Sequence, residues 1–310
     1  MQKIYSLLIL AFIAIGLGSF VDNEPIEPVK KVKVPDFIKI DDPWVDSILS
    51  LLTLEQKIAQ LIMYPVYTKN GEAELMKIEK LVDDFGIGGL IYMQGGPVSQ
   101  VNTHNRLMAR SKVPLLTSID GEWGVRMRLD SVIRFPRQML LGAIQDESLV
   151  YDMGVEIANQ CSSTGVHIIF APVVDINVNP NNPVINSRSF GEVKENVTRL
   201  SQAYMKGMQD NRVLACAKHF PGHGDTDVDS HLGLPVIKHS AERIQDIELY
   251  PFKALIDSGM GSVMVAHLYI PSLDNTKNRA STLSPKIVQG LLKDSLKFQG
   301  LAFTDALNMH

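Results

Sequence analysis

The sequence predicts an α/β protein of the TIM-barrel type, a (β/α)₈ barrel that ends after about its seventh strand. Short apolar runs rich in β-formers alternate with amphipathic stretches, which is typical of a parallel sheet with helical crossovers. Polar residues follow several of these runs. A parallel barrel uses the carboxyl ends of many strands for its active site, whereas an open doubly wound sheet gathers its ligands at one switch point. The spread of polar strand ends therefore favours the barrel.

The alternation predicts seven strands and six helices. The expected strands are residues 61–64, 89–93, 114–120, 166–172, 213–220, 262–268 and 300–305. The expected helices are residues 72–85, 98–110, 147–163, 193–211, 241–258 and 284–296. Ser284 and Pro285 mark the start of the last helix, because a capping residue precedes a proline at the first helical position.

Polar side chains occur at or just after the ends of five of the expected strands. These are Asp120, Asp175, Lys218 with His219, His267 and Asp305. The chain stops five residues after Asp305, and a closed barrel needs an eighth strand with its helix. We expect a C-terminally incomplete domain, with further sequence in the full-length protein, because an unpaired edge of apolar strands promotes aggregation. The alternative is a ring that stays open.

The composition indicates a soluble globular protein that binds no nucleic acid. Apolar residues make up 45% of the chain and charged residues 21%. The net charge is −4, and no run of Lys or Arg is present to contact a phosphate backbone. Cys161 and Cys216 lie in apolar or periodic segments, so we expect two buried thiols rather than a disulfide.

Residues 1–21 are typical of a signal peptide. A short start with one lysine precedes the apolar run of residues 4–21. An uncleaved membrane anchor is the alternative, since the run is close to the roughly 17 residues that span a bilayer. We expect cleavage, export to the periplasm or the cell exterior, and no stable membrane span afterwards.

Residues 22–42 are expected to form a linker between the signal peptide and the domain. They include Pro25 and Pro28 and lack apolar periodicity. The domain is expected to cover residues 43–310.

The most informative segment is KHFPGHGDTDVDSH, residues 218–231, directly after the fifth expected strand. It holds three histidines, three aspartates and a lysine, and its glycines and proline exclude a continuous helix. A polar loop at a strand end is a common place for chemistry. The residue types that could bind a metal are His219, His223, Asp225 and Asp229. No recognised metal-ligand spacing appears among them, and a solvated loop is the other alternative.

Two motifs resemble the family 3 glycoside hydrolases, in their β-N-acetylglucosaminidase branch. They are KHFPGHGDT followed by DSH and LP, and the final GLAFTDALNM. The resemblance covers about residues 50–310. It implies a retaining exo-β-N-acetylhexosaminidase that removes terminal β-linked N-acetylglucosamine from peptidoglycan- or chitin-derived glycans. It also implies that no metal or organic cofactor takes part.

The resemblance implies three catalytic residues. Asp305 is implied to be the nucleophile that forms a covalent glycosyl-enzyme, and an ionised carboxylate on a rigid strand end suits attack on an oxocarbenium-like carbon. His231, paired with Asp229, is implied to donate a proton to the leaving oxygen and later to accept one from water. A carboxylate beside an imidazole raises the imidazole pKa and fixes its tautomer, so one group can serve as acid and then as base.

The residue types alone leave alternatives open. A strand-end aspartate such as Asp305 often caps the following helix. His223, Asp225 and Asp227 compete with the loop pair, because spacing does not say which side chains meet. A neutral imidazole would not repel an anionic acceptor, so phosphate in place of water is a further hypothesis for the second step.

Five residues match the family's contacts to the saccharide: Asp120, Arg128, Arg188, Lys218 and His219. A carboxylate such as Asp120 is suited to accept hydrogen bonds from two sugar hydroxyls. For either arginine, a surface salt bridge is the alternative.

The stretch after Asp120 departs from the family pattern. The family usually has Asp-x-Glu-Gly-Gly-Arg, and this chain has Trp123 in place of a glycine and Val125 in place of the arginine. The choice between Arg126 and Arg128 therefore stays open. Trp123 either stacks on a sugar face or packs against the protein.

Two alternatives remain for the function. A family 3 β-glucosidase or β-xylosidase usually takes its acid from a second domain, and the DSH loop argues against this, because it places a donor within the chain. The other alternative is a catalytically silent glycan-binding fragment.

Overall fold

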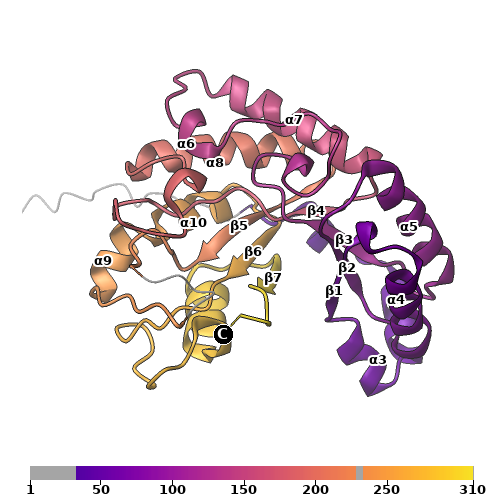
Figure 1. Cartoon of the computed structure of the whole chain (residues 1–310). Helices are drawn as coiled ribbons and strands as arrows, with labels where there is room; N and C mark the ends of the chain where they lie inside the picture. Colours follow the sequence, from indigo (N-terminus) through magenta and orange to yellow (C-terminus); the bar gives the residue numbers. More distant parts are fainter. Residues whose placement is uncertain (1–32, 228–232, 310) are drawn as a thin grey trace, which may run out of the picture. The chain divides into compact units, whose positions relative to one another are not determined.

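The described part of the chain is an α/β unit built on a parallel sheet (Figure 1). The computed structural model describes residues 33–227 and 233–309. Within these residues, seven parallel strands follow one another in chain order, and the sheet curls into a half-barrel with helices on its outer side. This arrangement confirms the α/β class and the truncated TIM-type barrel.

The strands lie close to where the sequence predicts them. Their bounds are β1 Met63–Val66, β2 Gly89–Tyr92, β3 Leu116–Ile119, β4 Ile168–Ile169, β5 Leu214–Phe220, β6 Ser262–Val265 and β7 Leu301–Thr304. β3 and β4 are shorter than expected but lie within their expected ranges. Only β1 is shifted as a whole: it begins and ends two residues later than expected, and Leu61 and Ile62 are exposed. β1 contains Pro65, which cannot donate to a ladder, and within the described residues β1 pairs only with β2.

The helices alternate with the strands. Their bounds are α2 Pro43–Leu51, α3 Leu54–Ala59, α4 Glu72–Phe85, α5 Pro97–Arg110, α6 Gln138–Leu141, α7 Ser148–Ser163, α8 Lys194–Gln209, α9 Ala241–Asp246, α10 Leu249–Asp257 and the π-helix η6 Lys286–Ser295. The sequence does not predict α2, α3 or α6. Apolar periodicity detects a buried stripe, and α2 has no buried residue.

The single helix expected over 241–258 is wrong, because the structure has two helices there. Proline lacks an N–H, and its ring clashes with the carbonyl four residues earlier, so it is tolerated only in the first turn. Pro251 would lie inside one long helix. The break at Ile247 instead places Pro251 in the first turn of α10.

The start of η6 contains the expected cap. Ser284 Oγ accepts a hydrogen bond from the Ile287 amide at 3.3 Å. The capping role predicted for Ser284 is therefore confirmed.

The N-terminal part of the described chain contacts the domain. Residues 1–21, the expected signal peptide, lie outside the described residues. Within the expected linker, Pro35 is buried, and the Lys33 amide donates to the Asp257 carbonyl at 3.3 Å. No helix in the described ranges is long and apolar enough to cross a membrane.

The sheet has an outer face covered by helices and an inward face with its own small cluster. The inward cluster consists of the buried residues Ile168, Phe170, Cys216 and Met264, with Met63, Ile91, Leu116, Leu214, Leu301 and Phe303 packed against them. Cys161, on α7, belongs to the larger cluster between sheet and helices. Both cysteines are buried free thiols, which confirms the sequence expectation.

Helices α7 and α8 approach each other at two glycines. A methyl group added to Gly207 would collide with the Tyr151 carbonyl and would lie 3.0 Å from the Gly154 Cα. A methyl group added to Gly154 would lie 2.7 Å from the Tyr204 carbonyl oxygen. The two backbones are therefore too close for any larger side chain.

Gly207→Ala is expected to lower the free energy of unfolding by about 1–3 kcal/mol, because the added methyl forces the helices apart. Gly290→Ala in η6 is the control, since its nearest neighbour, the Pro285 carbonyl oxygen, is 3.9 Å away. Urea unfolding of both variants measures the difference. Equal stabilities for Gly207→Ala and Gly290→Ala would contradict the close packing.

Candidate active site

Three charged residues lie on the inward face at the carboxyl ends of strands. They are Asp120 after β3, Lys218 in β5 and Asp305 after β7. Successive side chains of a strand alternate between the two faces. Each of the three is an even number of residues beyond an inward apolar residue, namely Leu116, Cys216 and Phe303. The alternation of the strands therefore directs all three toward the same side of the sheet.

Lys218 connects two carboxylates. Its Nζ lies 2.5 Å from Asp120 Oδ1 and 2.8 Å from Glu122 Oε1, and its side chain is only 2% exposed. Burial lowers the pKa of the Lys218 amine, but Asp120 and Glu122 outweigh this effect and raise the pKa above its usual value. Arg128 forms an ion pair with the other oxygen of Asp120. Lys218 therefore stays charged.

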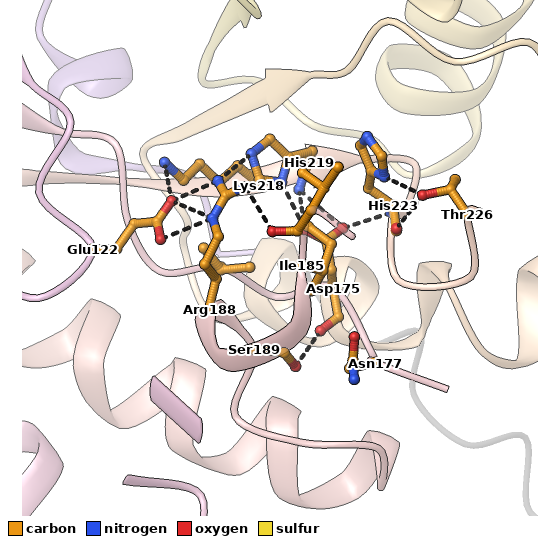
Figure 2. Close-up of polar contacts among 12 residues, drawn as sticks. Glu122, Asp175, Asn177, Ile185, Arg188, Ser189, Lys218, His219, His223 and Thr226 are labelled. Carbon is orange, nitrogen blue, oxygen red and sulfur yellow. Dashed lines mark hydrogen bonds and ion pairs between the residues drawn. The ribbon is translucent and has the colours of Figure 1, made fainter. Parts of the chain in front are cut away.

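Glu122 also holds Arg188, from the loop after β4 (Figure 2). Arg188 Nη2 donates to Glu122 Oε1 at 2.7 Å, and Arg188 Nε donates to Glu122 Oε2 at 3.0 Å. Burial raises the pKa of the Glu122 carboxyl, but Lys218 and Arg188 outweigh it and hold this pKa well below its usual range. Glu122 is therefore an ionised, fully buried carboxylate between two cations.

His219 has a defined tautomer. Its Nε2 lies 3.1 Å from Arg188 Nη2, and its Nδ1 lies 2.7 Å from Asp175 Oδ2. A guanidinium only donates, so Nε2 must accept and the ring proton lies on Nδ1, where it is donated to Asp175. Asp175 also accepts from the His223 amide at 2.7 Å. The buried Asp175 carboxylate thus fixes both His219 and the start of the following loop.

Lys218 and His219 reach the same network although they are neighbours in a strand. Strand alternation alone would direct them to opposite faces. The register of β5 against β6 shifts between Ala217 and Phe220, as in a β-bulge. A bulge re-aims a side chain in this way, and such irregularities are frequent next to active sites.

His223 lies four residues after His219 and is buried. Its Nδ1 lies 2.7 Å from Thr226 Oγ1, and its Nε2 has no hydrogen-bond partner within the described residues. Burial, with a smaller contribution from His219, lowers the pKa of His223 to about 4. The ring is therefore neutral near pH 7.

Asp305 is held at its backbone and is half-buried. Its amide donates to the Val265 carbonyl at 2.9 Å, and its Oδ1 accepts from the Ala306 amide at 2.8 Å. His267 Nε2 lies 3.0 Å from the Ala306 carbonyl oxygen, to which it donates. Burial raises the pKa of Cys216 to about 12, and Asp120 and Asp305 add to this rise. Both carboxylates therefore lie near the inward face of β5.

The structure brings together all five expected saccharide contacts. These are Asp120, Arg128, Arg188, Lys218 and His219. Arg128, rather than Arg126, reaches Asp120, whereas Arg126 Nη1 donates to the Leu129 carbonyl at 3.1 Å. The roles of the five residues in binding a sugar stay predictions. Asp229 and His231 lie outside the described residues.

Asp175 is expected among the polar strand ends, but the sequence assigns no specific role to Asp175 or to Glu122. The sequence contains a feature that could have indicated each of them. Glu122 is two residues beyond Asp120, and Asp175 follows an apolar run. Of the residues that compete with the loop pair, His223 is buried and Asp225 is paired with His239 and Arg243.

Trp123 has a partner on one face of its ring. The Arg137 guanidinium lies 4.8 Å from the ring centroid, and Arg137 Nη1 donates to Ser187 Oγ at 2.8 Å. Across the described ranges, no group of three or more His, Cys, Asp or Glu side chains is arranged to hold a metal ion.

Residues 53–310 match the model of the glycosyl hydrolase family 3 N terminal domain. The chain belongs to glycosyl hydrolase family 3. Its relatives support the β-N-acetylglucosaminidase branch expected from the loop motif. The β-hexosaminidase A of Pseudoalteromonas piscicida is 37% identical over 256 residues, which cover 75% of this chain and 43% of that protein.

Two solved structures resemble this family 3 chain. A family 3 β-N-acetylglucosaminidase from Paenibacillus sp. str. FPU-7 has a TM-score of 0.78 and 38% identity, over 83% of this chain and 50% of that one. The β-glucoside phosphorylase BglX bound to 2FGlc has a TM-score of 0.81 and 30% identity, over 86% and 49%. The family 3 chain thus spans about half the length of these proteins.

Glu122→Gln is expected to lower the free energy of unfolding by about 3 kcal/mol, because it leaves a buried site with two cations and one carboxylate fewer. The control is Glu79→Gln, which breaks the ion pair with Arg106 at 2.6 Å between α4 and α5, where the Arg106 side chain is 40% exposed. An ion pair at such a position contributes about 0–1 kcal/mol to folding. Urea unfolding of both variants measures the difference. An equal loss of stability in Glu79→Gln and Glu122→Gln would contradict the structural role of Glu122 between its two buried cations.

His223 is expected to make stability depend on pH. An unfolded histidine has a pKa of about 6.5, whereas the pKa of His223 in the fold is about 4. The unfolded chain therefore binds the proton more tightly, and stability present above pH 6.5 is lost as the pH falls toward 4. Between pH 7 and pH 5, the wild type is expected to lose about 2 kcal/mol more than His223→Asn. Equal losses in both proteins, measured by urea unfolding, would contradict the buried neutral ring.

Proposed function

We propose that the chain carries the active site of a retaining exo-β-N-acetylhexosaminidase. Its substrates would be terminal β-linked N-acetylglucosamine residues of peptidoglycan- or chitin-derived glycans. Family membership, the names of the relatives and the DSH loop support this proposal. They favour it over a β-glucosidase or β-xylosidase, which usually takes its acid from a second domain.

The arrangement of charged residues on the inward face of the sheet supports the proposal. Asp305 lies on the same side of the sheet as Asp120 and Lys218, and within the described residues no cation pairs with it. The cations of the site are instead matched by Asp120, Glu122 and Asp175. Asp305 is therefore the carboxylate left to meet the positive charge that develops on a sugar during retaining hydrolysis.

In the first step, one Asp305 oxygen bonds to the anomeric carbon as the bond from that carbon to the aglycone oxygen breaks. His231, with Asp229 beside it, gives its proton to the departing oxygen. Water then attacks the anomeric carbon, His231 takes a proton from that water, and Asp305 leaves as the carboxylate. Asp120, Arg188 and His219 are proposed to hold the sugar hydroxyls.

Asp305→Asn is expected to lower the release of 4-nitrophenol from 4-nitrophenyl N-acetyl-β-glucosaminide at least a thousandfold, because the covalent step loses its nucleophile. The control is Asp294→Asn, an exposed aspartate of η6, which should retain full activity. The wild type should release little nitrophenol from the matching β-glucoside.

Three outcomes would contradict the proposal in different ways. Full turnover by Asp305→Asn would exclude the nucleophile. Faster release from the glucoside would favour the β-glucosidase. Sugar binding without release by the wild type would favour a catalytically silent glycan-binding protein.

Phosphorolysis is a second candidate for the second step. One structural neighbour is named a β-glucoside phosphorylase. A neutral imidazole, unlike a second carboxylate, would not repel an anionic acceptor. With phosphate present, formation of N-acetylglucosamine 1-phosphate would support this candidate. Formation of free N-acetylglucosamine alone would support hydrolysis.

We also propose that residues 1–21 direct export to the periplasm or the cell exterior. The lysine and apolar run at the start of the chain support this. Fractionation of cells that produce the full sequence would test it, and cytoplasmic, uncleaved protein would contradict it.

A further inference from the structure

The loop after β5 has two legs that both contact the rest of the domain. We define the outgoing leg as residues 221–227 and the returning leg as residues 233–240. Both legs lie within the described residues. The expected catalytic residues Asp229 and His231 lie between them in the sequence.

The outgoing leg is anchored on the loop after β4. The His223 amide donates to Asp175 Oδ1 at 2.7 Å, and Asn182 Nδ2 donates to the His223 carbonyl at 2.8 Å. Gly224 packs so closely on the Ile176 backbone that an added methyl group would collide with it. This leg therefore has a fixed path.

The returning leg is anchored on the chain after β6. The Ile237 amide donates to the Tyr269 carbonyl at 2.9 Å, and the Tyr269 amide donates to the Pro235 carbonyl at 2.9 Å. The two legs thus rest on different parts of the barrel rim.

Asp225 and His239 join the two legs directly. His239 Nε2 lies 2.7 Å from Asp225 Oδ2, and Arg243 Nη2, from the first turn of α9, lies 3.3 Å from the same oxygen. Arg243 Nη1 in turn contacts both oxygens of Glu248, at 2.7 and 2.8 Å. Glu248 is buried and packs against Gly222, whose φ of +138° favours glycine.

We call the contacts of Asp225 with His239 and Arg243 the tie. The tie is suited to positioning the legs rather than to stabilising the fold. Asp225, His239 and Arg243 are 21%, 40% and 30% exposed, and ion pairs at such positions contribute about 0–1 kcal/mol to folding. The tie nevertheless links directly two legs that are otherwise anchored on different elements. Catalysis is sensitive to this, because displacing a catalytic group by about 1 Å costs roughly a hundredfold in rate.

We propose that Asp225, together with His239 and Arg243, is a positioning group for proton donation to the leaving oxygen. It acts by holding the ends of the segment that contains Asp229 and His231. This inference rests on the proposed function, and it assigns a role to residues that do not touch the sugar.

Leaving groups of different basicity test the proposal. A 2,4-dinitrophenolate leaves without a proton, whereas the oxygen of a second sugar needs one. For Asp225→Ala and His239→Ala, kcat/KM on N,N′-diacetylchitobiose is expected to fall at least tenfold. On 2,4-dinitrophenyl N-acetyl-β-glucosaminide it is expected to change less than twofold. Since kcat/KM reports only the steps up to the first irreversible one, the later use of the same group as a base does not interfere.

Two further variants complete the test. His239→Gln keeps an N–H donor near the position of Nε2 and is expected to restore most of the activity on the disaccharide. Asp246→Ala, which breaks the ion pair with Lys194 at 2.6 Å at the end of α9, should leave both substrates unaffected.

Equal losses on both substrates in Asp225→Ala would mean that the tie is only structural, and no loss on either would mean that it has no role. Either result overturns the positioning role while the proposed function stands. A wild type that cleaves neither substrate would instead contradict the proposed function.

Discussion

Lys218 carries a positive charge into the protein where water hardly reaches it, and Asp120 and Glu122 make this possible. A buried ammonium without a partner would lose its proton or destabilise the fold. The fold therefore requires that Asp120 and Glu122 lie beside Lys218. Glu122 extends the constraint to Arg188, and Arg188 extends it to His219. The loops after β3 and β4 and strand β5 are thus held at one place by alternating charges.

The same network prepares the site for a polar ligand without movement. Most of its donors and acceptors already have a partner and a direction, so little ordering of these side chains would be left to occur on binding. The His219 tautomer follows from this order, because Arg188 leaves its Nε2 only the role of acceptor. Asp305 is set apart from the network, and its backbone is held by Val265 and, through Ala306, by His267.

The sequence was sufficient for the positions of six strands, because short apolar runs alternate with amphipathic stretches along the chain. It could also have located the break before α10, since Pro251 cannot lie inside a helix. It could not predict that Lys218 and His219 share a network, because alternation separates neighbours and the register shift depends on β6. Nor could it predict the pairing of Glu122 with Arg188, which are distant in sequence and meet only after the barrel forms. The roles of Asp229 and His231 rest on the family motif, because both lie outside the described residues.

The balance of charge in the network affects how strongly the association rate of a ligand depends on ionic strength. Asp120, Glu122 and Asp175 match Arg128, Arg188 and Lys218 in number. This group of side chains therefore exerts almost no long-range pull on an ion. Even a charged ligand would approach these side chains at a rate that hardly varies with ionic strength, in contrast to proteins that attract their ligands by an electrostatic field.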